Sequence, residues 1–498
     1  MVKGTYDVVI AGTDLPAVIF GALAAKKGYR VLVLGHGSDK NVYEVNGYLF
    51  VRRSCSLFGL SDSAPIRNVF KELALSSEIN NLLQHVSPAC QVILPDARVD
   101  VSLQREVFTR EIEREFPGQF KTLESIFGEF EDVERLLEPV LATAPVLPPG
   151  SIREWFAYRN SNKALSSLLS KTGTDALEPL SAYPRLRSFL AGPTSAMSRL
   201  AEPWKAPIPF VRLISHMRSG PVFVEWGEDT LKKLFLARIN DNSGDVRGAD
   251  SVDTLVVKRG RVQEVEILNR AESIGVGMMV CGDDLHSFLP LIPQRQAKRR
   301  YHAKIEAKTP SHYGITLNLG MRRSGLPEGL AHMAHIISDP TKPMHGSNLL
   351  TIRIDPAMPP IEGQDPSKVT LSVTALMPAN RFNGQAAPIQ EFADEMLVQL
   401  KRLLPFLDEH LEVADVSSIK LDEKTGLPVL ERTGLIEIYP EIENRSIDLM
   451  TWPVRTAYKN MLNLANYTAG PLGFEGAFVA AQVAFSILSR QFELKRVM

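Results

Sequence analysis

The chain opens with the pattern of a strand, a helix and a second strand. Apolar runs at residues 7–11 and 30–34 are typical of buried strands, and the apolar spacing of residues 16–27 is typical of a helix. Pro16 suits the first turn of this helix, and Gly28 stands where its C-cap belongs. A strand, helix and strand in this order begin a doubly wound sheet, so the sequence predicts an α/β fold whose first unit is of the nucleotide-binding type.

The turn between the first strand and the helix departs from the dinucleotide-binding pattern. In that pattern, GxGxxG, the glycines allow a tight turn, a close approach of backbone to diphosphate, and close packing of helix on strand. Here the three positions hold Gly12, Asp14 and Ala17. Asp14 puts a carboxylate where phosphates would lie, and two unit charges about 4 Å apart repel by roughly 1 to 4 kcal/mol. Gly35 stands where an acidic residue usually binds the ribose.

Composition narrows the functional classes. A chain of 498 residues is long enough for two or three domains, and 44% hydrophobic with 23% charged residues is ordinary for a globular protein. The net charge of −1 gives no reason to expect nucleic acid as a partner. Cys55, Cys90 and Cys281 lie far apart, so we expect neither a disulfide framework nor a cysteine metal site. With no targeting segment apparent, we expect a cytoplasmic protein.

Four stretches spread over nearly the whole chain share their order and spacing with one superfamily. They are DVVIAGTDLPAVIFGALAAKKGYRVLVL at residues 7–34, NGYLFVRRSCSLFGL at 46–60, the hairpin DTLVVKRGRVQEVEIL at 253–268 with the apolar run after it, and NLANYTAGPLGFEGAFVAAQVA at 463–484. In these stretches the chain resembles the superfamily of phytoene desaturases, flavin amine oxidases and Rab GDP-dissociation inhibitors. The opening of the first stretch is most similar to the dissociation inhibitors.

The resemblance implies a Rossmann-like FAD/NAD(P)-binding domain that is discontinuous in sequence. It would comprise residues 1–80, 211–291 and 453–498. Residues 81–210 and 292–452 would form a substrate or partner domain with a helical part and a β-sheet, which makes this domain α+β.

The local pattern of the second domain agrees with that division. Helical periodicity runs over residues 100–141, and an amphipathic helix is predicted for residues 391–411. Between them, strands are predicted from residues 312, 348 and 368.

The departures from the family pattern fall around one ligand. Flavin-binding relatives have a glycine pair after the second strand, which GHGSDKNVYEV lacks here, and a C-terminal Gly-[Asp/Glu] pair where this chain has Asn466 and Tyr467. Together with Asp14 and Gly35, these changes lead us to expect no FAD in the usual pose, with FAD kept as the alternative. The residues of this degenerate cofactor site would be Gly12, Thr13, Asp14, Ala17, Gly35, Val252, Asn466, Tyr467, Gly473, Phe474 and Glu475.

No residue is assigned a catalytic role by the sequence. His332 and His335 are the one close histidine pair, but strand geometry would place them on opposite faces and no further ligand accompanies them, so no metal site is expected. Cys55 follows Arg52 and Arg53, yet a buried structural cysteine explains it better than a reactive thiol.

Three functional hypotheses follow. The first is a non-catalytic protein that binds an apolar, isoprenoid-like ligand or a protein partner. The second is an FAD-dependent oxidoreductase of desaturase or amine oxidase type with rebuilt cofactor contacts, and the third is a membrane-peripheral accessory subunit. The third depends on residues 295–308, which hold six lysines and arginines and could attract anionic lipids, although a solvated connection between domains explains them equally simply.

Overall fold

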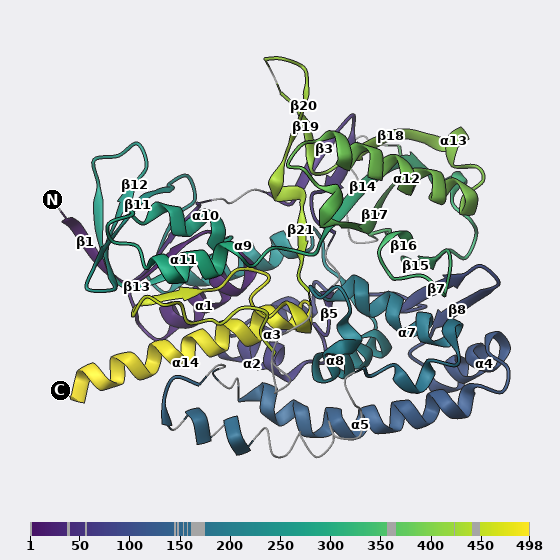
Figure 1. Ribbon diagram of the computed structural model, residues 1–498, viewed down its shortest axis with the longest axis horizontal. Coiled ribbons are helices and arrows are strands. Elements are labelled where there is room, and N and C mark those ends of the chain that lie inside the picture. Colours follow the sequence, from purple (N-terminus) through teal and green to yellow (C-terminus); the bar gives the residue numbers. More distant parts are fainter. Residues whose placement is uncertain are drawn as a thin grey trace.

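The computed structural model describes residues 2–36, 40–54, 57–143, 146, 149–152, 154–156, 158–160, 175–355, 365–422, 424–440 and 449–497. Two large sheets organise these residues, one on the left and one on the right of Figure 1. The expected α/β fold, with a Rossmann-like unit and an α+β second part, is confirmed.

The first sheet has a parallel core built around the opening strand. Strand β1 pairs in parallel with β2 on one side and β13 on the other, and β10 and β22 extend this parallel set. A hairpin of β11 and β12 continues the sheet in antiparallel fashion and turns at Gly260, as expected. The strands are β10 (Asp245–Arg247), β2 (Val31–Leu34), β1 (Val2–Ala11), β13 (Ser273–Cys281), β12 (Arg261–Ile267), β11 (Val252–Lys258) and β22 (Met461–Asn463).

Three helices that are distant in sequence pack together on one face of this sheet. Helix α1 (Leu15–Lys26) contacts both α9 (Glu228–Asp241) and α14 (Glu475–Val497). From Leu15 to Ala25 every residue of α1 is buried, because the helix is covered on all sides. The last helix, yellow in Figure 1, thus lies beside the first one.

The second sheet is mostly antiparallel and is covered by helices on both faces. Helix α12 (Ala387–Leu403) packs on one face, and a layer of α4 (Arg105–Glu115), α5 (Phe120–Ala142), α7 (Pro184–Met197) and α8 (Pro207–Ser219) covers part of the other. The strands are β18 (Leu411–Val416), β14 (His312–Arg322), β17 (Lys368–Pro378), β16 (Gly346–Arg353), β15 (Met333–Ile337), β7 (Cys90–Leu94), β8 (Ala97–Val101) and β21 (Ile436–Ile438).

Shorter elements connect these layers. They are β3 (Val42–Val45), β4 (Tyr48–Val51), β5 (Leu57–Phe58), α2 (Ala64–Glu72), α3 (Ser76–Asn80), β6 (Gln84–His85), β9 (Pro221–Phe223), α10 (Leu285–Phe288), α11 (Arg299–Glu306), α13 (Leu407–His410), β19 (Ile419–Leu421) and β20 (Pro428–Leu430). Hairpin β19–β20 projects from the top of the molecule in Figure 1.

Two predicted helices have different bounds in the structure. Residues 100 and 101 belong to β8, which pairs with β7, and the helical run after them is divided into α4 and α5 near Gly118. The helix predicted for residues 391–411 ends at Leu403, because the residue before Pro405 disfavours the helical conformation. No helix among the described residues has the length and apolar character needed to cross a bilayer.

Candidate functional site

The turn after β1 is packed against the end of β13. Gly12 has a φ of +96°, and a Cβ at this position would lie 2.4 Å from the carbonyl oxygen of Gly282. The Asp14 N–H donates to that same oxygen at 2.9 Å. Gly282 in turn has no room for a side chain, since its Cβ would lie 2.7 Å from the Cβ of Ala17. The tight turn and the close helix packing of the dinucleotide-binding unit are therefore kept.

The phosphate position of that unit holds a contact between two of the altered residues. One carboxylate oxygen of Asp14 accepts a hydrogen bond from the backbone N–H of Asn466, and the other accepts one from the Asn466 side-chain amide, both at 2.9 Å. Asp14 precedes the first turn of α1 without capping it through its side chain. The N-terminus of α1 is thus covered by a carboxylate whose two oxygens are bound by the loop before α14.

Charged groups surround this contact. Burial raises the pKa of Asp14, while Arg53 and Lys232 act in the opposite direction. Lys232 pairs with Glu228 at 2.9 Å one turn earlier on α9. Burial and then the charge of Asp14 raise the pKa of the neighbouring Asp283 to about 7. Two carboxyl groups therefore share this region with two cations, and burial together with the charge of Asp14 favours the protonated form of Asp283.

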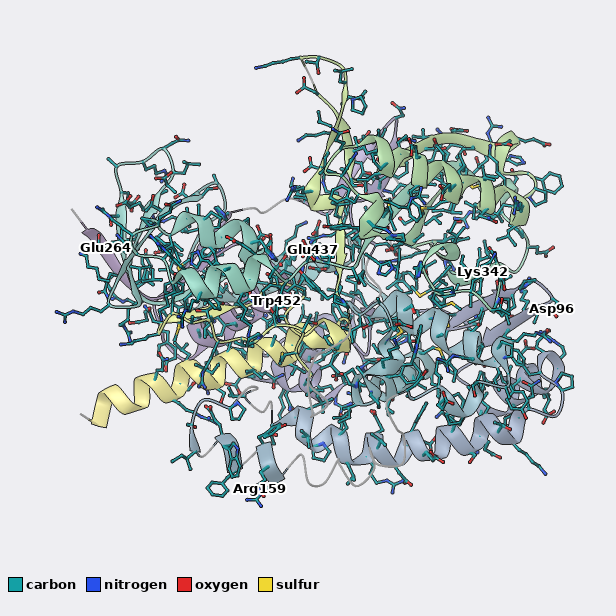
Figure 2. The ribbon with its side chains drawn as sticks, in the orientation of Figure 1. Asp96, Arg159, Glu264, Lys342, Glu437 and Trp452 are labelled. Atoms are coloured by element: carbon teal, nitrogen blue, oxygen red, sulfur yellow. The ribbon has the colours of Figure 1, made fainter. Side chains whose placement is uncertain are left out.

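A polar cavity of about 310 Å³ extends from Asp14 between the two halves of the molecule. This volume is at the small end of the range for ligand pockets. Figure 2 labels Glu437, one of its lining residues, near the centre of the molecule. The lining residues are Thr13, Asp14, Lys40, Asn41, Arg52, Arg53, Arg199, Lys232, Gly282, Asp283, Asp284, Ser287, Tyr313, Phe382, Arg432, Thr433, Leu435, Glu437, Asn466 and Tyr467.

Tyr467 is fixed at the wall of this cavity. Its hydroxyl accepts a hydrogen bond from the Leu285 N–H at 2.8 Å and donates one to Asp284 at 3.4 Å. Its ring centroid lies 5.2 Å from that of Trp452, labelled in Figure 2, and 5.6 Å from that of Tyr439. Burial raises the pKa of Tyr467, so the hydroxyl stays protonated. The ring is part of a packed aromatic cluster and is not free to swing away.

An apolar cavity of about 100 Å³ adjoins the polar one, and Arg199 and Asn466 line both. Its walls come from the ends of α1, α7 and α14 and from strands of the second sheet. The predicted residues Gly473 and Phe474 line it. Other apolar lining residues are Leu15, Ala196, Met197, Leu349, Ala375, Leu376, Ile436, Ile438 and Ala477.

Gly35 and Val252 lie outside both cavities. A Cβ at Gly35 would stand 1.8 Å from the carbonyl oxygen of Gly248, so the end of β2 has no room for a ribose-binding carboxylate. The buried Val252 donates its backbone N–H to the His36 ring at 3.3 Å. These two residues position strand ends and do not reach the cavities.

Glu475 points into the protein core. Its carboxylate accepts two hydrogen bonds from Arg212, at 2.6 and 2.7 Å, and one from Ser63 at 2.5 Å, and it lies 3.1 Å from His216. Burial alone would raise the pKa of Glu475, yet His216 and Arg212 hold it well below its usual range. This group joins α14 to α8 and α2, which indicates a structural role.

The other residues that the sequence singled out are dispersed. Buried His335 contacts Thr351, whereas His332 contacts the carbonyl of Ile354, so they do not form a pair. Cys55 lies outside the described residues. In the described ranges, no group of three or more His, Cys, Asp or Glu side chains is placed to hold a metal ion.

The cations of the polar cavity were not predicted as a group. In the sequence Arg52 and Arg53 stand out only as neighbours of Cys55, and Arg199, Lys232 and Arg432 stand in no motif. Only the folded chain brings these segments together.

No protein-family model and no curated protein matches the sequence. Solved structures do match. An oxidoreductase from Methanosarcina mazei has 14% identity over 97% of this chain and 99% of its own, with a TM-score of 0.57. A triple mutant of putrescine oxidase has 12% identity over 98% and 99%, with a TM-score of 0.56. A Rab GDI from Plasmodium falciparum has 12% identity over 98% of each chain, with a TM-score of 0.49.

The first two structures align with this chain over nearly its full length. At such low identity the likeness concerns the fold. This chain therefore shares the fold of these two structures, an oxidoreductase and a putrescine oxidase.

Proposed function

We propose that this protein is a non-catalytic member of a flavoprotein-type fold and that it binds an apolar, isoprenoid-like ligand between its two halves. The observation that carries the proposal is the contact between Asp14 and Asn466. A carboxylate with both oxygens bound by another loop stands at the helix N-terminus where a dinucleotide would place its phosphates. The proposal assigns no catalytic residue.

The residues at this place do not fit FAD in its usual pose. Asp14 adds negative charge at the diphosphate position, and Gly35 has no space for a carboxylate that would bind the ribose. Tyr467 lies in the loop that meets the flavin in the relatives that the sequence resembles. A hydrogen bond from the Leu285 N–H to its hydroxyl holds the side chain in place. We therefore derive no chemical step through a flavin.

The apolar cavity, together with the polar cavity that adjoins it, is the proposed binding site for the ligand, because about 100 Å³ alone lies below the range for ligand pockets. Leu376, Ile436, Ile438 and Phe474 give the apolar cavity an apolar surface, and residues from both halves line it. Each Å² of apolar ligand surface removed from water there contributes about 25 cal/mol. A protein partner in place of the small ligand, and a membrane-peripheral role in the cytoplasm, are the alternatives within this proposal.

An FAD-dependent oxidoreductase with rebuilt contacts is the second candidate, and one observation favours it. Six lysines and arginines but only four carboxylates line the polar cavity, which suits a phosphorylated ligand. Two similar structures are an oxidoreductase and a putrescine oxidase. In such an enzyme the flavin would supply the redox chemistry, and the protein would bind and orient the substrate.

The test uses the purified full-length chain. Visible flavin absorbance is measured before and after incubation with FAD and desalting, and the melting temperature is measured with FAD and with farnesol. We expect no retained flavin, no effect of FAD on the melting temperature, and a rise with farnesol, because a ligand that binds the folded state stabilises it. Retention of one FAD per chain, with a higher melting temperature, would overturn the proposal.

A matched pair of variants locates the site. Ala196→Phe, which places a ring at the apolar cavity, should abolish the effect of farnesol. Ala387→Phe, at an exposed position on α12, should leave that effect unchanged. Equal loss in both variants, or in neither, would place the ligand elsewhere.

A further inference from the structure

The polar cavity has an excess of positive charge. Its cations come from separate parts of the chain: the flanks of hairpin β3–β4, the end of α7, helix α9 and the turn before β21. The cations are Lys40, Arg52, Arg53, Arg199, Lys232 and Arg432, and the carboxylates are Asp14, Asp283, Asp284 and Glu437. Low-dielectric walls concentrate the field of such a set, so the cavity attracts anions.

Three of the four carboxylates already have donors within the chain. Besides Asp14, which Asn466 binds, Asp284 accepts a hydrogen bond from the His286 N–H at 3.0 Å. Glu437 accepts one from the Tyr439 hydroxyl at 2.6 Å. The charges of these three carboxylates are thus directed at groups of the protein, and so is that of Lys232, which pairs with Glu228.

Arginines form most of this cationic set. A planar guanidinium can bind two oxygens of one phosphate, which a lysine cannot do. Two contacts orient the guanidinium of Arg52. Its Nε–H donates a hydrogen bond to the Lys40 carbonyl at 3.2 Å, and its Cζ lies 4.9 Å from the centroid of the Tyr43 ring. In the part of the chain that the structure describes, no ion pair involves the side chain of Lys40 or Arg432.

The polar and the apolar cavity meet at Arg199 and Asn466. A ligand that occupies both has an apolar chain on one side of this junction and a charged end on the other. Asp14 keeps that charged end away from the N-terminus of α1, so side chains and not the helix terminus must hold it.

We propose that the ligand is an apolar chain that ends in a phosphate or diphosphate, with its head in the polar cavity and its chain in the apolar one. This inference rests on the proposed function and adds the chemistry of the head. It differs from a flavin site because arginines distributed around the cavity bind the anion, while the dinucleotide turn does not.

Calorimetric titrations of the chain use four probes: farnesyl diphosphate, farnesol, inorganic diphosphate and FAD. Their affinities distinguish the contribution of the apolar chain from that of the anionic head and from flavin binding. Farnesyl diphosphate is expected to bind at least about tenfold more tightly than farnesol or inorganic diphosphate, since charge-assisted hydrogen bonds add to apolar burial. Its affinity should fall with added salt, and that of farnesol should not.

Two substitutions test the cations directly. Arg432→Gln and Arg52→Gln are each expected to lower the affinity for farnesyl diphosphate about tenfold, because each removes one phosphate contact. Neither substitution should change the affinity for farnesol. Lys424→Gln, an exposed lysine in the β19–β20 hairpin outside the cavity, is the control and should change neither affinity. Melting temperatures without ligand show whether each variant is folded.

The outcomes distinguish this inference from the function on which it rests. Equal affinities for farnesol and farnesyl diphosphate would contradict the proposal of an anionic head group. They would leave the proposal of an apolar ligand standing. Tight binding of FAD, with neither farnesyl compound bound, would overturn both. Loss of farnesyl diphosphate binding in Lys424→Gln as well would contradict the assignment to the cavity.

Discussion

Gly35 and Gly248 lie in backbone contact, so that a Cβ at Gly35 would stand 1.8 Å from the Gly248 carbonyl oxygen. The Gly35 N–H also donates to the carbonyl of Arg247 at 3.1 Å. The loop after β10 thus fills the space that a ribose-binding side chain would need. The close contact between Gly35 and Gly248 leaves no room for an acidic side chain at position 35. A single substitution at Gly35 therefore cannot restore a ribose-binding carboxylate.

Gly35→Ala should therefore destabilise the protein by about 3 kcal/mol, since the methyl group forces the backbone of β2 or of the loop to move. Gly128→Ala is the control, because Gly128 is exposed within α5 and no atom approaches its Cβ position. That change should stabilise the protein by roughly 0.5 to 1 kcal/mol. Chemical denaturation measures both, and equal effects would contradict the contact.

The ion pair between Glu475 and Arg212 should be a main support of the fold. Glu475→Gln leaves the buried guanidinium without its two-point partner, and we expect a loss of roughly 3 to 5 kcal/mol in unfolding free energy. Glu131→Gln breaks the exposed pair with Arg218 and should cost less than about 1 kcal/mol. A small effect of Glu475→Gln in denaturant titrations would show that Glu134 and Glu138 compensate.

The same carboxylate gives the fold a defined acid sensitivity. His216 and Arg212 lower the pKa of Glu475 despite its burial, so the unfolded state takes up the proton first as pH falls. The stability from this group is complete above the ordinary glutamate pKa of 4.5 and is lost progressively below it. Melting temperatures of the wild type and Glu475→Gln should converge as the pH is lowered, and parallel curves would contradict this pKa.

Asp283 should titrate near neutrality. Burial and then Asp14 raise its pKa to about 7, so the folded state holds a proton that the unfolded state loses near 3.8. This carboxyl therefore contributes a stability that falls as pH rises between those values. Carbon NMR of labelled aspartate should show the midpoint near 7, and Asp14→Asn should lower it. The exposed Asp253→Asn is the control, and a midpoint that does not move in Asp14→Asn would contradict the coupling.

The basic stretch at residues 295–308 can be tested with vesicles. Lys298 donates to the Ala457 carbonyl and Lys308 lies over the Trp452 ring, but the other four cations of the stretch are exposed. Near an anionic surface each cation contributes about 1 kcal/mol, so we expect salt-sensitive co-sedimentation with phosphatidylserine vesicles. Replacing Arg299 and Arg300 by Gln should weaken it. If the protein does not sediment with the vesicles at low salt, residues 295–308 are a solvated connection between domains and not a lipid-binding surface.

The sequence predicts the elements whose signals are local. The opening strand, helix and strand follow from apolar periodicity, and the β11–β12 hairpin follows from its turn at Gly260. The sequence predicts a helix at residues 100 and 101, because the helical periodicity of α4 begins close by. Pairing with β7, which no local pattern shows, makes them a strand.

For the site, the sequence identifies the altered position but not its partner. Asp14 is conspicuous because it interrupts a known pattern, whereas the contact with Asn466 joins residues at opposite ends of the chain. Arg199, Lys232 and Arg432 have no spacing that predicts a common cavity. Such a set depends on how the two halves meet, which periodicity does not describe.

The parallel pairing of β22 with β13, and the position of α14 beside α1, have a consequence for synthesis in the cell. The first sheet keeps an unpaired edge and an uncovered helix until β22 and α14 have been synthesised. Nearly the whole chain must therefore wait in an incomplete form, in which exposed apolar surface and open strand edges favour aggregation. We expect shielding of the nascent chain, by a chaperone or by its own second half, to limit this aggregation.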